Sequence, residues 1–232
     1  MTTDTAKFDF DKARFNMIEQ QIRPWEVLDA GVLALLNEVK REDFAPAALR
    51  TVALVDMELP LSTPAQEGQS MLAPKVEART IQELALQPHE TVLEIGTGSG
   101  HMAAMMAKLC AKVVTVEIDG SLAQQAQENL RSAGVSNVEV RHADATAQRF
   151  AACQQGAPFD AIVLSGSVAE VPSSMLDLLK DGGRLFAVVG DEPVMRATVI
   201  RRTGPASFHT VQPWDISTAR LKNFPEPSAF RF

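Results

Sequence analysis

The chain has 232 residues, 46% of them hydrophobic and 22% charged, which is ordinary for a globular protein of about one domain. A formal net charge of −7 and a pI near 5.2 argue against nonspecific binding to nucleic acid or to an anionic membrane, so we expect neither as a partner. Cys110 and Cys153 lack C-x-x-C spacing and lie in apolar surroundings, which favours buried free thiols in a cytoplasmic protein.

Residues 1–74 are predicted to form an N-terminal helical region followed by a loop. An amphipathic helix is expected over 13–22, ending before a proline, and a second over 29–39 with Asp29 as its N-cap. The proline-punctuated stretch 59–74 is typical of a loop or an edge strand. The N-terminus carries acids and no apolar core of a signal peptide, and no apolar run is long enough to span a membrane.

Residues 75–232 alternate between strand and helix patterns. Ser121 is the expected N-cap of one helix, with Gln124 completing a capping box. Two final alternating runs are expected to close the sheet as an antiparallel hairpin. The fold class predicted is α/β: a doubly wound, mainly parallel seven-stranded sheet with an N-terminal helical extension. The expected helices are 75–86, 101–109, 121–133 and 172–180, and the expected strands are 92–95, 112–116, 138–141, 159–164, 184–189, 197–202 and 208–211.

The most informative segment is 92–100, VLEIGTGSG, an apolar strand that ends in a glycine-rich turn before a helix. Gly96, Gly98 and Gly100 permit positive φ and leave the backbone N–H groups open to a ligand. A dinucleotide-binding turn has its third glycine where this chain has His101, so the spacing is different from that motif. The alternative is a tight strand-to-helix connection without a ligand.

Two acids follow at the ends of the next strands. Glu117 comes 21 positions after Gly96, where a carboxylate can accept hydrogen bonds from both ribose hydroxyls of a nucleoside. Asp144 follows the strand 138–141. Because the carboxyl ends of parallel strands face one crevice, the glycine turn and these acids are expected to converge. The alternatives are an exposed strand-end acid at 117 and a turn aspartate at 144.

The pattern E-x-G-x-G-x-G resembles motif I of class I S-adenosylmethionine-dependent methyltransferases, which have a Rossmann-like sheet. That resemblance implies S-adenosylmethionine as cofactor and S-adenosylhomocysteine as product. It places Glu117 at the ribose and Asp144 at the adenine amine, and it makes 75–232 the cofactor-binding core. The cofactor-binding residues that it implies are Glu94, Gly96, Thr97, Gly98, Ser99, Gly100, Glu117, Ile118, Asp144 and Ala145.

Further blocks along the chain resemble protein-L-isoaspartate O-methyltransferases, over about residues 16 to 202. The resemblance implies methyl transfer to the carboxylate of damaged aspartyl residues, with an isoaspartyl protein or peptide as partner and 1–74 as the helical cap and substrate-side loop. No metal is expected. The blocks that carry it are EQQIRP at 19–24, REDFAP at 41–46, LPL at 59–61, GQS at 68–70, LEIGTGSG at 93–100, APFDAIV at 157–163 and VGDE at 189–192.

The chain departs from that family in the segment before Pro74. The family carries a hydroxyl residue two positions before this proline, where the chain has Leu72, and Ser70 stands where the family usually has threonine. Ser70 is therefore the candidate catalytic residue, with Gln69, Leu72 and Ser165 on the substrate side. Two alternatives stay open: a methyltransferase with a diverged small-molecule acceptor, and a nonenzymatic homologue that binds the cofactor or a partner.

The chemistry favours a carboxylate acceptor. A carboxylate is ionised at neutral pH and needs no general base, and no His–carboxylate pair stands out in the sequence. His101 and His142 are the alternative bases. The aromatic C-terminal tail, with Phe224, Phe230 and Phe232, is expected to pack on the chain itself or else to dock on a partner. The oligomeric state is left open.

Overall fold

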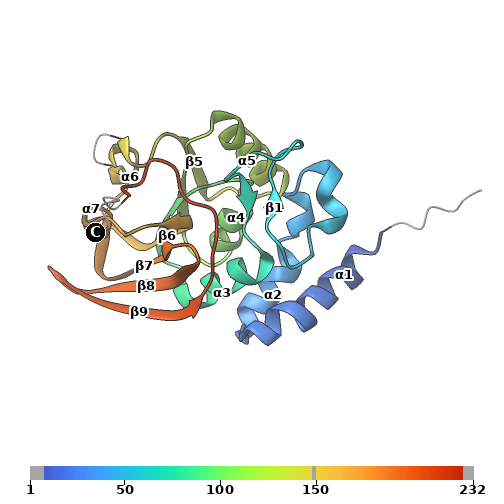
Figure 1. The fold of residues 1–232 in the computed structure, drawn as a ribbon, viewed down its shortest axis with the longest axis horizontal. Coiled ribbons are helices and arrows are strands. Elements are labelled where there is room, and N and C mark those ends of the chain that lie inside the picture. Colours follow the sequence, from blue (N-terminus) through green and yellow to red (C-terminus); the bar gives the residue numbers. More distant parts are fainter. Residues whose placement is uncertain (1–7, 148–149, 227–232) are drawn as a thin grey trace, which may run out of the picture.

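The computed structural model describes residues 8–147 and 150–226, arranged around one seven-stranded sheet (Figure 1). The strand order is β5-β4-β3-β6-β7-β8-β9, parallel from β5 to β7 and antiparallel for the last two strands. This confirms the predicted fold class and the closing hairpin. The strands are β3 (Thr91–Ile95), β4 (Lys112–Glu117), β5 (Val138–His142), β6 (Phe159–Val168), β7 (Leu179–Asp191), β8 (Val194–Gly204) and β9 (Ser207–Asp215).

Helices and turns cover both faces of the sheet, and each face has its own buried core. Successive strand residues point to opposite faces, so Val92 and Ala161 join one cluster while Leu93 and Ile162 join the other. The first cluster includes the N-terminal helices, α3 and α4; the second includes α6 and α7. The helices are α1 (Phe10–Met17), α2 (Ala30–Glu38), α3 (Pro74–Leu84), α4 (His101–Ala107), α5 (Gly120–Ser132), α6 (Ala151–Gln154) and α7 (Ser173–Leu176).

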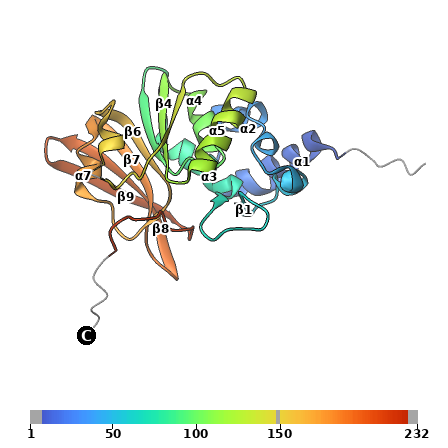
Figure 2. The same cartoon turned by 90° about the horizontal axis from the view of Figure 1, so that it is seen from above.

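The N-terminal region packs beside α3 and α4 (Figure 2), and it contacts β9 through Trp25, whose ring centroid lies 6.0 Å from that of Trp214. The first helix continues through a π-helical turn at Ile18–Ile22, and Asp29 caps α2 by accepting from the Val32 amide at 2.9 Å, as predicted. The stretch after residue 58 forms two short antiparallel strands, β1 (Leu59–Pro60) and β2 (Ser70–Met71). The prediction of a loop with edge strands is confirmed.

Two helix predictions are wrong at their ends. The N-cap of α5 is Asp119 and not Ser121, because the Asp119 carboxylate accepts hydrogen bonds from the amides of both Ser121 and Leu122. The helix expected over 172–180 stops after one turn at Leu176. It stops there because the backbone at Leu179 already pairs with Phe159 as the first residue of β7.

Both cysteines are buried and free, as predicted, and burial raises the pKa of each thiol to about 11. Within the two described ranges, no helix combines the length and the apolar character needed to cross a bilayer.

Candidate functional site

The glycine turn connects β3 to α4 in a conformation that few other residues adopt. The φ angles of Gly96, Gly98 and Gly100 are +93°, +53° and +84°. A Cβ atom on Gly96 would lie 3.1 Å from the side chain of Leu221 and 3.4 Å from the Ser165 carbonyl oxygen, so this position also lacks room. The turn therefore keeps its shape only with glycine, and it brings main-chain atoms to the edge of the sheet.

Glu117 ends β4 next to this turn and is held by backbone amides. Its Oε2 accepts from the Gly98 amide at 2.9 Å and its Oε1 accepts from the Asp119 amide at 3.0 Å. The side chain is almost completely buried but lines a cleft. Each carboxylate oxygen can accept more than one hydrogen bond, so both oxygens keep capacity for hydroxyl groups of a ligand.

Asp144 lies just beyond the end of β5 and lines the same cleft. Its Oδ1 accepts from the amide and the hydroxyl of Thr146 at 2.8 and 2.7 Å, and its Oδ2 accepts from the Asn223 side-chain amide at 2.7 Å. Partial burial works to raise the pKa of Asp144, but these hydrogen bonds more than offset it and leave the pKa below its usual range. The group is thus an ionised acceptor.

The cleft lies where β3 and β6 meet, at the carboxyl ends of the parallel strands, where open α/β sheets bind ligands. It contains about 670 Å³ of space outside protein atoms, its open mouth included. It brings together most of the predicted site residues. Those that line it are Gln69, Ser70, Gly96, Gly98, Glu117, Ile118, Asp144, Ala145 and Ser165.

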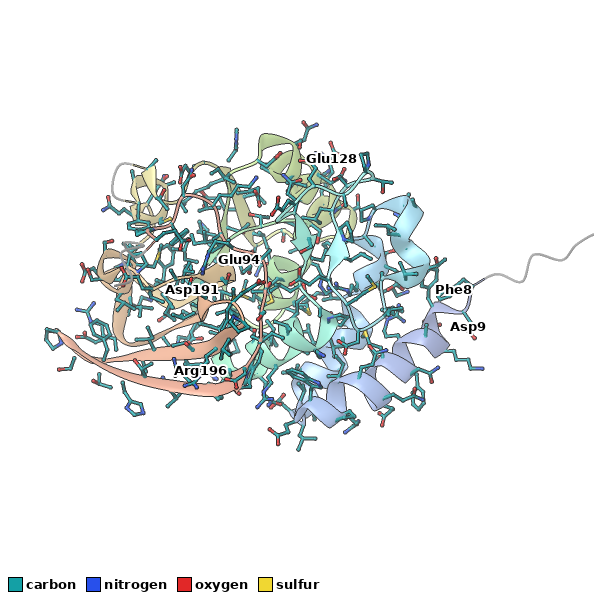
Figure 3. All side chains as sticks on the ribbon, in the orientation of Figure 1. Phe8, Asp9, Glu94, Glu128, Asp191 and Arg196 are labelled. Atoms are coloured by element: carbon teal, nitrogen blue, oxygen red, sulfur yellow. The ribbon has the colours of Figure 1, made fainter. Side chains whose placement is uncertain are left out.

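Glu94 and Thr97 lie beneath the cleft wall and do not line it. The Glu94 carboxyl accepts from the Thr115 hydroxyl at 2.7 Å and from the Ser165 hydroxyl at 2.8 Å, while Thr97 and Thr115 share a 2.7 Å hydrogen bond. Figure 3 labels Glu94 near the middle of the molecule. Burial raises the pKa of Glu94 to about 8 despite these hydrogen bonds, so the carboxyl is mostly protonated at neutral pH.

Three other predicted residues also lie away from the cleft wall. The Ser99 carbonyl accepts from the Asn129 side chain at 3.0 Å, and Gly100 lies against α5, so both connect the turn to that helix. The Leu72 side chain is buried in the core cluster that contains α3. Only the Leu72 backbone makes a polar contact, in which its carbonyl accepts from the Arg41 guanidinium at 2.7 Å.

The loop before α3, predicted to face the substrate, contributes side chains that are already paired. The Ser70 hydroxyl donates to Glu58 at 2.7 Å, and the Gln69 amide donates to Asp119 at 3.1 Å. The other oxygen of Glu58 accepts from the Thr218 hydroxyl at 2.7 Å. The loop is thus connected both to the helix cap of α5 and to the C-terminal part of the chain.

Neither candidate histidine lines the cleft. His101 is buried at the start of α4, with its Nδ1 3.0 Å from Glu77, and Glu77 also pairs with Arg41. Burial opposes ionisation of Glu77, but Arg41 and His101 more than offset it and hold the pKa of that carboxyl below its usual value. His142 is exposed at the end of β5. The described cleft wall therefore offers no imidazole base.

The sequence reasoning missed one whole wall of the cleft. Arg220, Leu221, Lys222 and Phe224 line it from a segment that follows β9. In Figure 1 this segment, dark red, leaves β9 and passes over the sheet toward α6. It has no periodic pattern, so nothing in its sequence indicated this position. Asp119 was also missed, although its place two residues after Glu117 was a usable signal.

Self-packing of the tail is confirmed for Phe224, which is buried with its ring centroid 6.3 Å from that of Phe150. Phe230 and Phe232 lie outside the described residues.

The sequence is similar to a known family along most of its length. A family model for protein-L-isoaspartate(D-aspartate) O-methyltransferase matches residues 12–213. A Herpetosiphon aurantiacus protein-L-isoaspartate O-methyltransferase is 38% identical over 195 residues, 84% of each chain, and one from Methanoculleus marisnigri is 42% identical over 183 residues, 77% of this chain and 78% of its own.

Among solved structures, a Plasmodium falciparum chain described as such a methyltransferase, in complex with S-adenosyl-L-homocysteine, superimposes with a TM-score of 0.75. The match covers 93% of this chain and 99% of the other at 20% identity, and it therefore supports the fold. On the family match and the sequence identities, the chain belongs to the protein-L-isoaspartate(D-aspartate) O-methyltransferase family.

Proposed function

We propose that the chain is an S-adenosylmethionine-dependent methyltransferase that esterifies a carboxylate of damaged aspartyl residues in proteins or peptides. The observation that carries this proposal is the meeting of the glycine turn, Glu117 and Asp144 on one cleft. When bound there, the cofactor supplies an electrophilic methyl group on a sulfonium. The chain's own residues bind it, orient it and bring the acceptor into line.

The part of the cleft proposed for adenosine has hydrogen-bond acceptors for the hydroxyl and amino groups of a nucleoside. Glu117 takes the two ribose hydroxyls, since its oxygens keep free lone pairs while backbone amides fix its position. Asp144 takes the adenine amine, and Ile118 and Ala145 pack on the ring from the strand ends beside these acids. A Cβ atom on Gly98 would lie 3.3 Å from the side chain of Leu61, which also lines the cleft, so a side chain at this position would crowd the ligand.

The methionine end lies toward Gly96 and Ser165. Glu94 acts on the ligand's ammonium group through Ser165, whose hydroxyl joins the cleft wall to the buried carboxyl. A cation arriving nearby favours the ionised form of Glu94 and so lowers the raised pKa of this group. Thr97 and Ser99 support the turn from below, and Gly100 lets α4 and α5 approach closely.

A carboxylate acceptor agrees with the absence of histidine from the described wall. The nucleophile is already ionised at neutral pH, so the chain must position it and exclude water rather than remove a proton. Ser70 and Gln69 lie at the entrance as positioning groups. The cytoplasmic location stays a prediction from the sequence.

The test is methyl transfer from labelled S-adenosylmethionine to a peptide that contains isoaspartate, with the normal aspartyl peptide as control. We expect base-labile methyl ester on the isoaspartyl peptide alone. Ester formation on a panel of small carboxylic acids instead would favour the small-molecule alternative. Cofactor binding without transfer to any acceptor would favour the nonenzymatic alternative.

A further inference from the structure

The segment 216–226, which we call the C-terminal strap, is a fixed part of the site. The backbone of Ser167 donates to the Ala219 carbonyl at 2.8 Å and accepts from the Leu221 amide at 2.9 Å, which forms a strand-like bridge to the end of β6. The Ser167 hydroxyl donates to the Thr218 carbonyl at 2.9 Å. Further along, the buried Phe224 anchors the strap. The family match ends at residue 213, so the strap is a feature of this chain outside that match.

The strap separates the cofactor cleft from a second, open groove. That groove is lined by strap residues together with Glu58, Glu67 and Glu192. Gly68, Arg220 and Lys222 line both cavities, so the two spaces meet at these residues. An acceptor lying in the groove reaches the cofactor cleft at this junction.

The two cations at the junction differ in their pairing. Arg220 donates to Asp191 at 2.6 Å and to the Gly190 carbonyl at 3.0 Å, and it lies 3.1 Å from Glu226, so its charge is compensated. Lys222 is exposed and has no ion pair or hydrogen bond within the described residues. Among the described residues that line either cavity, Lys222 is the cation without a partner.

The substrate-side loop offers no free hydroxyl group to an acceptor carboxylate, and Lys222 can supply a hydrogen-bond donor in its place. Leu72 replaces the family's hydroxyl and is buried, and the Ser70 hydroxyl is already donated to Glu58. The groove walls are acidic and repel an anion, so an approaching carboxylate is drawn to the single uncompensated positive charge. The lysine side chain is flexible, so its ammonium group can stay in contact with the acceptor carboxylate as the carboxylate enters the cleft.

Resting on the proposed function, we infer that Lys222 is the acceptor-binding residue that holds the anionic carboxylate at the cleft entrance. The attraction between its ammonium group and the acceptor carboxylate binds the acceptor before transfer. This attraction weakens as the carboxylate becomes a neutral ester. Lys222 therefore lowers KM and contributes little to kcat.

The experiment measures binding of a fluorescent isoaspartyl peptide to the full chain saturated with S-adenosylhomocysteine, which requires no turnover. Lys222→Met should weaken binding about tenfold, the low end for a charge-assisted hydrogen bond at an exposed site. Lys222→Arg should restore most of the affinity. Lys40→Met is the matched control, because Lys40 is an exposed cation that lines a different surface cavity.

Two readouts separate this role from a general effect on the strap. The first is affinity for S-adenosylhomocysteine: a displaced strap would lower it in Lys222→Met and Lys222→Arg alike, through Leu221 and Phe224, whereas loss of the charge alone leaves Lys222→Arg at the wild-type affinity. Added salt should weaken peptide binding to wild type more than to Lys222→Met. Equal peptide affinities for wild type and Lys222→Met, or no peptide binding to wild type, would overturn the inference. Absence of ester formation by wild type would count instead against the proposed function.

Discussion

The cofactor half and the acceptor half of the cleft are built in different ways. In the proposed cofactor half, the backbone amide of Gly98 donates to the side-chain carboxylate of Glu117, which is 19 residues away in the chain and ends the neighbouring strand. In the acceptor half, Thr218 reaches Glu58 across 160 residues through side chains alone. The first arrangement follows from local strand and turn geometry, and the second exists only after the whole chain has folded. Substitutions should therefore affect the two halves differently.

The largest effect is expected in the cofactor half. Gly98→Val should abolish cofactor binding, with at least a hundredfold loss of affinity (about 2.7 kcal/mol), because the side chain enters the cleft at a φ of +53°. Calorimetric titration with S-adenosylhomocysteine measures this. Gly134→Val is the matched control, since Gly134 also has a positive φ, +70°, but lies in open space away from the cleft. Unchanged affinity in Gly98→Val would mean that the glycine turn does not contact the cofactor.

Leu72→Ser tests whether the acceptor half depends on a hydroxyl at this position. We expect a loss of about 2–4 kcal/mol in the free energy of unfolding, because a buried side chain of the core is truncated. Urea denaturation measures it, with the volume-conserving Leu72→Met as control. Turnover of an isoaspartyl peptide should not rise. A gain of turnover would mean that the original acceptor had been abandoned in this chain.

Glu117→Ala should weaken cofactor binding by about 1–3 kcal/mol, the scale of charge-assisted hydrogen bonds. Glu139→Ala is the control, because Glu139 is a β5 carboxylate that pairs with Lys112 and does not line the cleft. Titration with S-adenosylhomocysteine compares the two variants. Equal affinities of the two variants for S-adenosylhomocysteine would mean that Glu117 does not bind the ribose.

Taken over a single pH unit, the smallest effect is expected at Glu94. The folded chain retains the Glu94 proton up to about pH 8, whereas the unfolded chain releases it near the ordinary value of 4.5. The unfolded state thus binds fewer protons in that window, and this group lowers the free energy of unfolding as pH rises, by at most about 1.4 kcal/mol per pH unit.

Glu94→Gln should remove that slope. Denaturation curves of variant and wild type at several pH values between 4.5 and about 8 measure how the free energy of unfolding changes with pH in each. Parallel curves would mean that the native carboxyl is ionised throughout.

Sequence reasoning located the glycine turn and the acids at the strand ends because their signals are local. Strand ends, glycine spacing and the distance from Gly96 to Glu117 follow from the geometry of successive parallel strands. It failed where competing contacts decide the structure. Ser121 satisfies the pattern of a capping box, but the charged carboxylate of Asp119 accepts from the Ser121 and Leu122 amides and caps the helix two residues earlier. The strap has no periodicity, and its position depends on pairing with Ser167.

The strap also determines which residue can stand at one position of β6. A Cβ atom on Gly166 would lie 2.9 Å from the Leu221 side chain and 3.1 Å from the Ala219 carbonyl oxygen. The strap therefore requires glycine at this position. A larger residue at 166 would displace Leu221, which lines the cleft, so this packing also sets the shape of the cleft wall.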